Sequence, residues 1–184
     1  MRRIPAAASK HVQLPDLGER ICILGPSNSG KSTLANAIAR KCGLKAIHLD
    51  QLYHIPNSNW TPRPPDEFVA LHDHAIIGDQ WVMDGNYSKC MPQRFLRATG
   101  LILLDVSMPL SLFRYARRTL CARDRVGTLE GARDSIKWAM IHHIAIVTPW
   151  SRRRYAEIYR QTPLPKIYLP SAQAIDQCYR HWSL

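Results

Sequence analysis

The chain of 184 residues is 46% hydrophobic and carries 25 Lys and Arg against 14 Asp and Glu, a formal net charge of +11. This length fits one domain around a single core, and no apolar run approaches the ~20 residues that cross a bilayer. The charge favours anionic partners such as nucleotides, polyphosphates or nucleic acid, without choosing among them. Scattered cysteines without a CxxC pair, and a start without an apolar stretch, predict a reduced cytoplasmic chain with no zinc site.

The hydrophobic pattern predicts strands that alternate with helices along the chain. An N-terminal arm at 1–19 precedes a domain at 20–184 that begins with a strand at 20–25 and a helix at 31–42. Further strands are expected at 45–50, 80–85, 100–106 and 166–170, and helices at 65–76, 91–98, 109–122, after 130 to about 147, 151–161 and 172–182. Residues 52–65 are expected to form a loop. The alternation implies a three-layer α/β fold, with a parallel five-stranded sheet and helices on both faces.

"GPSNSGKST" at 25–33 is a glycine-rich turn between the first strand and the first helix, and it fits G-x-x-x-x-G-K-[ST]. Such a loop turns successive backbone N–H groups inward, and the positive end of the helix dipole points at the same place. Lys31 adds a charge toward the β- and γ-phosphates, and the Ser32 hydroxyl can ligate Mg²⁺. The turn therefore predicts an ATP phosphate-binding loop (a P-loop, or Walker A motif) formed by Gly25, Pro26, Ser27, Asn28, Ser29, Gly30, Lys31, Ser32 and Thr33.

Three predicted strands end in a carboxylate, at Asp50, Asp84 and Asp105. Because ligands gather at the carboxyl ends of parallel strands, we expect these acids on one rim beside the loop. Asp84 and Asp105 are predicted to bind Mg²⁺ together with Ser32. Asp50 is predicted to orient or deprotonate an acceptor hydroxyl, or to serve Mg²⁺ if the acceptor is a phosphate. Each aspartate taken singly also fits a turn at the end of a strand.

Other classes of P-loop protein carry signatures that this sequence lacks. It has no NKxD-like guanine reader and no LSGGQ-like segment, and 184 residues are few for a motor with its coupling domains. These exclusions leave a compact kinase that binds a nucleoside triphosphate and a small acceptor.

The segments "GPSNSGKSTLA", "HLDQLYHIPNSNW", "WVMDGNY" and "LILLDVSMPLSLFRYARR" together carry a family resemblance. Over about residues 20–160 the chain resembles the adenylate-kinase-related P-loop kinases known as DNA topology modulation proteins, and more distantly the adenylate kinases. The resemblance implies a nucleoside-monophosphate-kinase-like fold with a short lid, and ATP with Mg²⁺. In adenylate kinases "DGNYS" corresponds to an Asp-Gly-Phe-Pro-Arg segment. Asp84 and Gly85 are kept, whereas the arginine that grips the monophosphate is absent.

The resemblance also assigns roles to arginines after the fourth strand. Arg114 and Arg118 match a pair, four residues apart, that serves the triphosphate in adenylate kinases, and this spacing puts both on one helical face. Residues 119–135 are predicted to form a lid whose arginines, Arg123 among them, close over the transferring phosphoryl group. A solvated basic helix end is the alternative. The run "RRR" at 152–154 favours a solvated face or a weak nucleic-acid contact over catalysis.

Tyr53, Trp60 and Tyr87, with the amides of Asn59 and Asn86, are candidates for the acceptor side. Aromatic rings near amides suit a flat acceptor such as a base or nucleoside, and packing explains such rings equally well. The eight histidines show no metal-ligand spacing and are assigned to surface or packing positions.

The sequence thus predicts an ATP- and Mg²⁺-dependent phosphotransferase that moves the γ-phosphate to a nucleotide, a nucleoside or a similar small acceptor. Its predicted catalytic residues are Lys31, Asp50, Asp84, Arg118 and Arg123. The alternative is a nucleic-acid-associated regulator, as the family's name and the charge of +11 suggest, which binds ATP and transfers little phosphate. Nucleic-acid binding is left open and is not favoured, no membrane partner is expected, and a monomer and a homodimer are both consistent with the sequence.

Overall fold

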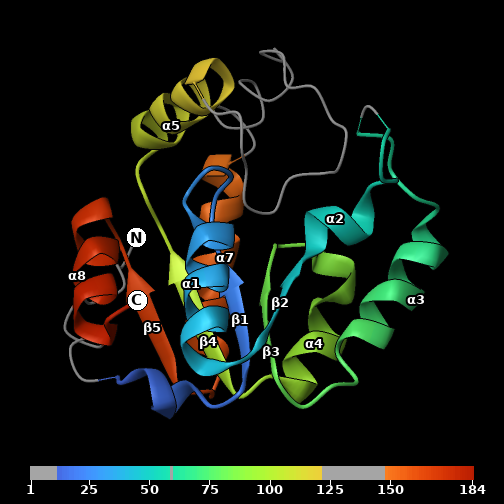
Figure 1. Cartoon of the computed structure of the whole chain (residues 1–184), viewed down its shortest axis with the longest axis horizontal. Coiled ribbons are helices and arrows are strands. Elements are labelled where there is room, and N and C mark those ends of the chain that lie inside the picture. Colours follow the sequence, from blue (N-terminus) through green and yellow to red (C-terminus); the bar gives the residue numbers. More distant parts are fainter. Residues whose placement is uncertain (1–11, 59, 122–147) are drawn as a thin grey trace.

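The computed structural model describes residues 12–58, 60–121 and 148–184, of which residues 115, 117–121 and 148–151 are described by backbone alone. Five strands form one parallel sheet in the order β2-β3-β1-β4-β5 (Figure 1). Their bounds are β1 (Arg20–Leu24), β2 (Lys45–His48), β3 (Trp81–Asp84), β4 (Gly100–Leu104) and β5 (Lys166–Leu169). Because β1 lies at the centre, the loop after it lies between the residues that follow β3 and β4.

Helices connect the strands, as the crossover between parallel neighbours requires. The helices of the described residues are α1 (Lys31–Cys42), α2 (Leu49–Tyr53), α3 (Pro65–Ala75), α4 (Met91–Arg97), α5 (Met108–Cys121), α7 (Thr148–Gln161) and α8 (Ala172–Trp182), with short 3₁₀ turns η2 (Leu14–Leu17) and η3 (Ser88–Cys90). None of these helices is long and apolar enough to span a membrane.

Alternate residues of β1 enter two separate cores, because successive side chains of a strand point to opposite faces of the sheet. Ile21 and Ile23 pack on the face that α1 and α8 cover, whereas Cys22 and Leu24 pack on the face that α3, α4 and α7 cover. With both faces covered, β1 and β4 can be apolar at nearly every position.

The predicted α/β class, the five parallel strands and the helices on both faces are confirmed. Several boundaries were wrong. The strand expected at 45–50 ends at His48, and α2 occupies Leu49–Tyr53, which the prediction divided between strand and loop. Leu49, the first residue of α2, is fully buried in the core. The strand expected at 100–106 ends at Leu104, and the helix expected at 151–161 begins at Thr148. Most of the predicted lid lies outside the described residues, as does the helix expected before 147.

Part of the predicted N-terminal arm belongs to the core of the domain. Leu14 and Leu17 of η2 are buried against the face that carries α1 and α8. Trp182 of α8 donates its indole N–H to the Val12 carbonyl at 3.4 Å. Residues 12–19 therefore pack as a turn against the domain, and residues 1–11 lie outside the described part.

Candidate active site

The loop at 25–30 has the backbone geometry that the motif predicts. Asn28 and Gly30 adopt positive φ angles of 58° and 98°, which lets the chain curl before α1 begins. Gly30 is the N-cap of α1 and has no side chain that could accept from the first N–H groups of the helix. Ser29 Oγ is buried and has no hydrogen-bond partner within the described part of the chain. These donors fit the oxygens of a polyphosphate.

Two cationic side chains donate hydrogen bonds to carbonyls of this loop. Lys31 Nζ donates to the Pro26 carbonyl at 2.8 Å, and Arg114 Nη1 of α5 donates to the Ser29 carbonyl at 2.9 Å. Arg114 is thus brought to the loop from 85 residues away. Arg118 lies one turn further along α5 and only its backbone is described, and Arg123 lies outside the described residues.

Asp84, at the end of β3, is the centre of a buried polar network. The Ser32 hydroxyl donates to Asp84 Oδ2 at 2.8 Å, and His48 Nδ1 hydrogen-bonds Asp84 Oδ1. His48 Nε2 lies 3.2 Å from Asn36 Oδ1 on α1. Asp84 and His48 are only 4% and 8% exposed, so these partners compensate a carboxylate that would be costly to bury alone.

The register of β2 and β3 explains the pairing of His48 with Asp84. The two residues are direct Cα partners in the parallel ladder, and Ser32 and Asn36 lie four residues apart on one face of α1. Sequence reasoning missed His48 and Asn36 because it sought metal-ligand spacing among the histidines. The signal that could have found His48 was its position at a strand end, two residues before Asp50.

The described residues hold no cluster of three His, Cys, Asp or Glu side chains suited to a metal. Mg²⁺ commonly takes only one or two carboxylates from the protein and completes its shell with phosphates and water. Ser32 and Asp84, in contact beneath the phosphate loop, fit that role. The fit rests on oxygen donors, the ligand type that Mg²⁺ prefers.

Asp105 is placed differently from the prediction that gave it a metal. Its Oδ1 accepts from Arg152 Nε at 2.5 Å, and its Oδ2 accepts from the Tyr168 hydroxyl at 2.7 Å. Burial and this carboxylate raise the pKa of Tyr168, so its hydroxyl stays a donor. Both Asp105 oxygens are thus engaged by α7 and β5, which favours Asp84 over Asp105 as the carboxylate for Mg²⁺, and a metal role for Asp105 stays a prediction. Arg152 is half-buried in this ion pair, whereas the next two arginines of the run are exposed.

Asn86 ties the segment after β3 to the phosphate loop. Its Nδ2 donates to the Gly25 carbonyl at 2.9 Å, and its Oδ1 accepts from the Gly25 N–H at 3.2 Å. Arg94 of α4 holds the same segment from below, with Nη1 donating to the Gly85 carbonyl at 3.1 Å and Nη2 to the Asn86 carbonyl at 3.0 Å. Arg94 is fully buried, and burial lowers the pKa of its guanidinium. No sequence pattern indicated that this arginine is internal.

Arg94→Met is expected to lower the free energy of unfolding by about 2–4 kcal/mol, because two buried carbonyls would lose their donors. The relief from burying a charge offsets part of that loss. Urea unfolding measures the change, with exposed Arg180→Met on α8 as the control, which should change stability by less than about 0.5 kcal/mol. Equal stabilities for Arg94→Met and Arg180→Met would show that Arg94 does not hold the segment after β3.

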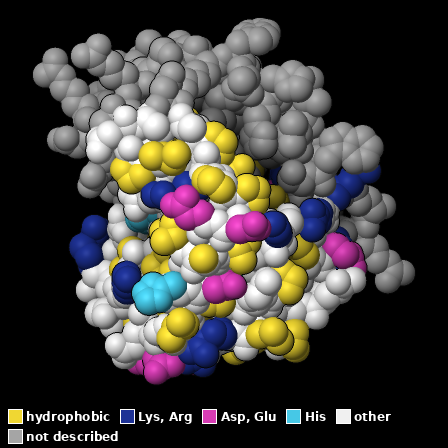
Figure 2. Space-filling view, turned by 90° about the vertical axis from the view of Figure 1, so that its right-hand side faces the viewer, with side chains coloured by type: hydrophobic (Ala, Val, Ile, Leu, Met, Phe, Trp, Pro, Cys, Tyr) yellow, Lys and Arg dark blue, Asp and Glu magenta, His cyan; other side chains and the backbone are white. Residues whose placement is uncertain are grey.

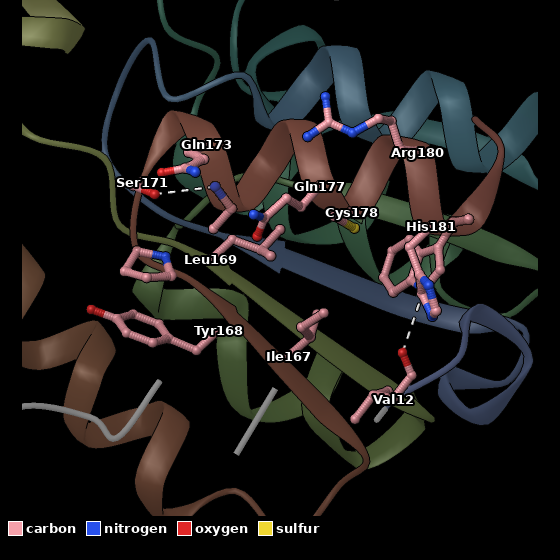
Figure 3. Close-up of a pocket in the computed structure, with 13 residues that line it drawn as sticks. Val12, Ile167, Tyr168, Leu169, Ser171, Gln173, Gln177, Cys178, Arg180 and His181 are labelled. Carbon is pink, nitrogen blue, oxygen red and sulfur yellow. Dashed lines mark hydrogen bonds between the residues drawn. The ribbon is translucent and has the colours of Figure 1, made fainter. Parts of the chain in front are cut away.

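Two cavities of the described residues lie away from this network. One of about 710 Å³ lies between β5 and α8, where Ile167 and Leu169 face Cys178 (Figure 3). Another of about 450 Å³ lies between α4 and α7. Neither of these two cavities is lined by a residue of the phosphate loop, and the candidate active site is argued from the contacts around Ser32 and Asp84.

No family model matches the chain, and a comparison with curated proteins found no match. Among solved structures, the shikimate kinase from Acinetobacter baumannii in complex with shikimate aligns with a TM-score of 0.53 and 14% identity, covering 96% of this chain and 94% of that one. A gluconokinase from Sinorhizobium meliloti 1021 aligns with a TM-score of 0.44 and 19% identity, covering 82% of this chain and 99% of that one. The similarity to shikimate kinase, together with the sheet order and the loop, shows a P-loop NTPase fold. Membership of the DNA topology modulation family stays a prediction.

Proposed function

We propose that the chain is an ATP- and Mg²⁺-dependent phosphotransferase that acts on a small molecule. The observation that carries the proposal is the contact of Ser32 with Asp84 directly beneath an uncapped helix N-terminus. A hydroxyl and a carboxylate in this arrangement suit a metal ion that bridges the phosphates of ATP. The P-loop NTPase fold places both side chains at the carboxyl edge of the sheet, where such proteins bind ligands.

Each residue of the site has a role in positioning the triphosphate. The loop amides, Lys31 and Arg114 bind phosphate oxygens, and Ser32 with Asp84 would hold Mg²⁺. The metal, when bound, supplies positive charge that offsets the charge developing on the phosphates. His48 and Asn36 keep Asp84 in one orientation, so little reorganisation is needed during the reaction. Arg118, Arg123 and the lid at 119–135 are proposed to cover the γ-phosphate.

The surface over α3 bears on the alternative of a nucleic-acid regulator. In Figure 2 the described part of this face carries Lys and Arg side chains interspersed with Asp and Glu, with no continuous basic surface. Binding to a nucleic-acid backbone needs clustered cations. This face therefore gives the regulator no support, and the kinase is the better account of the site.

Lys31→Ala is expected to lower phosphoryl transfer from γ-labelled ATP by about 10²–10³-fold, because it removes a fixed charge from the transferring group. The assay presents a panel of nucleosides, nucleotides, sugars and hydroxy acids, and follows label on each compound and on free phosphate. Exposed Lys41→Ala, in the last turn of α1, is the matched control. A protein that binds no ATP by calorimetry, or that retains DNA in a salt-dependent way without any turnover, would contradict the proposed function.

A further inference from the structure

Asp50 and Tyr87 form a second polar pair next to Asp84. The Tyr87 hydroxyl donates to Asp50 Oδ1 at 2.6 Å, while the Asp50 side chain is otherwise exposed. Asp50 follows His48 by two residues, and Tyr87 follows Asp84 by three. The chain after β2 and the chain after β3 are therefore joined at two places, by the contact of His48 with Asp84 and by the contact of Asp50 with Tyr87. In the first of these contacts, Asp84 also accepts from Ser32 at the start of α1.

The Tyr87 ring is fixed by two neighbouring rings. Its centroid lies 4.9 Å from that of Tyr53 and 5.1 Å from that of Phe68, and the Tyr53 and Phe68 centroids are 5.2 Å apart. The Tyr87 backbone has a positive φ of 22°, an unusual conformation for a bulky residue. Packing on two rings leaves the hydroxyl one direction, toward Asp50. The Asp50 carboxylate is thereby held in place before any ligand arrives.

The charges around this pair disfavour an anion. Burial and then the Asp50 charge raise the pKa of Tyr87, and Asp84 adds to the same effect, so the tyrosine remains a neutral donor. Of the two nearby guanidinium groups, Arg94 binds backbone carbonyls, whereas Arg63 pairs with Glu67 through Nη1 at 2.5 Å and its buried Nε has no hydrogen-bond partner among the described residues. Among the described Lys and Arg side chains of these two segments, Arg63 and exposed Lys89 remain as candidate cations for a phosphate, and both are therefore tested directly.

We infer that the acceptor is an uncharged molecule that presents a hydroxyl to Asp50, and is not a nucleoside monophosphate. The inference rests on the proposed kinase function and names its substrate class. The acceptor oxygen forms a bond to the γ-phosphorus while the bond from that phosphorus to the β,γ-bridging oxygen breaks. ADP leaves with the electron pair, and the hydroxyl proton passes to the Asp50 carboxylate and then to solvent. Asp50 is the catalytic residue, and Tyr87 is its positioning residue.

Dinucleoside pentaphosphates test the acceptor class without knowledge of the acceptor. These compounds join ATP to a nucleoside monophosphate through one extra phosphate, with adenosine, guanosine, cytidine or thymidine at the second end. Calorimetry should give each a Kd within about threefold of that for ATP, because the second end finds no phosphate site. Binding about tenfold tighter or more would overturn the inference, and its loss in Lys89→Ala or in Arg63→Ala would identify the cation that holds the second end. Absence of ATP binding would instead contradict the proposed function, so the two failures are distinguishable.

Two conservative variants test the roles of Asp50 and Tyr87. Asp50→Asn should lower kcat by about 10²–10⁴-fold, with the KM for ATP unchanged. The kcat is measured for phosphoryl transfer to the best acceptor of the panel, or for ATP hydrolysis where no compound of the panel is phosphorylated. Tyr87→Phe should lower kcat by about tenfold, again at constant KM for ATP, since one hydrogen bond is removed. Tyr159→Phe on α7, which removes a tyrosine hydroxyl outside the candidate site, is the control and should leave both values unchanged. Label on a nucleoside monophosphate, or equal kcat values for Tyr87→Phe and Tyr159→Phe, would refute the assignment.

Discussion

Asp84→Asn is expected to lower kcat for phosphoryl transfer by about 10²–10³-fold, because the negative charge that would hold Mg²⁺ is lost at a buried position. The substitution keeps the size of the side chain, and asparagine can still accept from the Ser32 hydroxyl, which lies 2.8 Å from Asp84 Oδ2. Calorimetry with ADP gives a second measurement. Mg²⁺ should strengthen ADP binding to the native chain and fail to do so for Asp84→Asn, while metal-free ADP binds both chains alike.

Asp105→Asn is the informative comparison, since Asp105 also ends a strand at the same edge. Its oxygens are engaged by Arg152 and Tyr168, so the Mg²⁺ dependence of turnover should stay as in the native chain. Asp176→Asn on the exposed side of α8 controls for loss of a carboxylate in general. Full Mg²⁺ dependence in Asp84→Asn, or loss of Mg²⁺ dependence in Asp105→Asn, would show that the assignment of the metal to Asp84 is wrong.

Gly85→Ala is expected to lower the free energy of unfolding by about 3 kcal/mol, since it combines backbone strain with overpacking. Gly85 has φ of +129°, and a Cβ there would lie 2.7 Å from Leu49 Cβ, an atom attached to the backbone of α2. Leu49 cannot yield by rotating its side chain, so the segments after β2 and β3 must separate. Thermal unfolding should show a Tm lower by about 6–12 °C, and the pairs of Asp84 and Asp50 should be displaced.

Gly43→Ala separates the two parts of that effect. Gly43 ends α1 with φ of +70°, and a Cβ there would meet nothing within 4 Å. It therefore carries the backbone cost alone, about 1 kcal/mol. If Gly85→Ala destabilised the chain no more than Gly43→Ala, the close approach of Leu49 to Gly85 would not be a constraint on the fold.

Local sequence determined most of the architecture. Apolar runs separated by amphipathic helices required a parallel sheet covered on both faces, because parallel strands need crossovers and the crossovers are helical. The glycine-rich turn specified its own backbone, since positive φ at Gly30 and an uncapped helix start depend on adjacent residues alone. For the same reason Lys31 and Ser32 could be assigned a place from the motif's spacing.

The tertiary structure alone decided which carboxylate meets which partner. Asp84 and Asp105 look alike in sequence, each at the end of an apolar strand. The sheet order places β3 beside β2, so Asp84 meets His48, and it places β4 beside β5, so Asp105 meets Tyr168 and Arg152. The charge of Arg94 gives no sign of its burial, because its carbonyl partners belong to a segment that folds over α4. Side-chain partners of this kind depend on strand order and register, which no local pattern encodes.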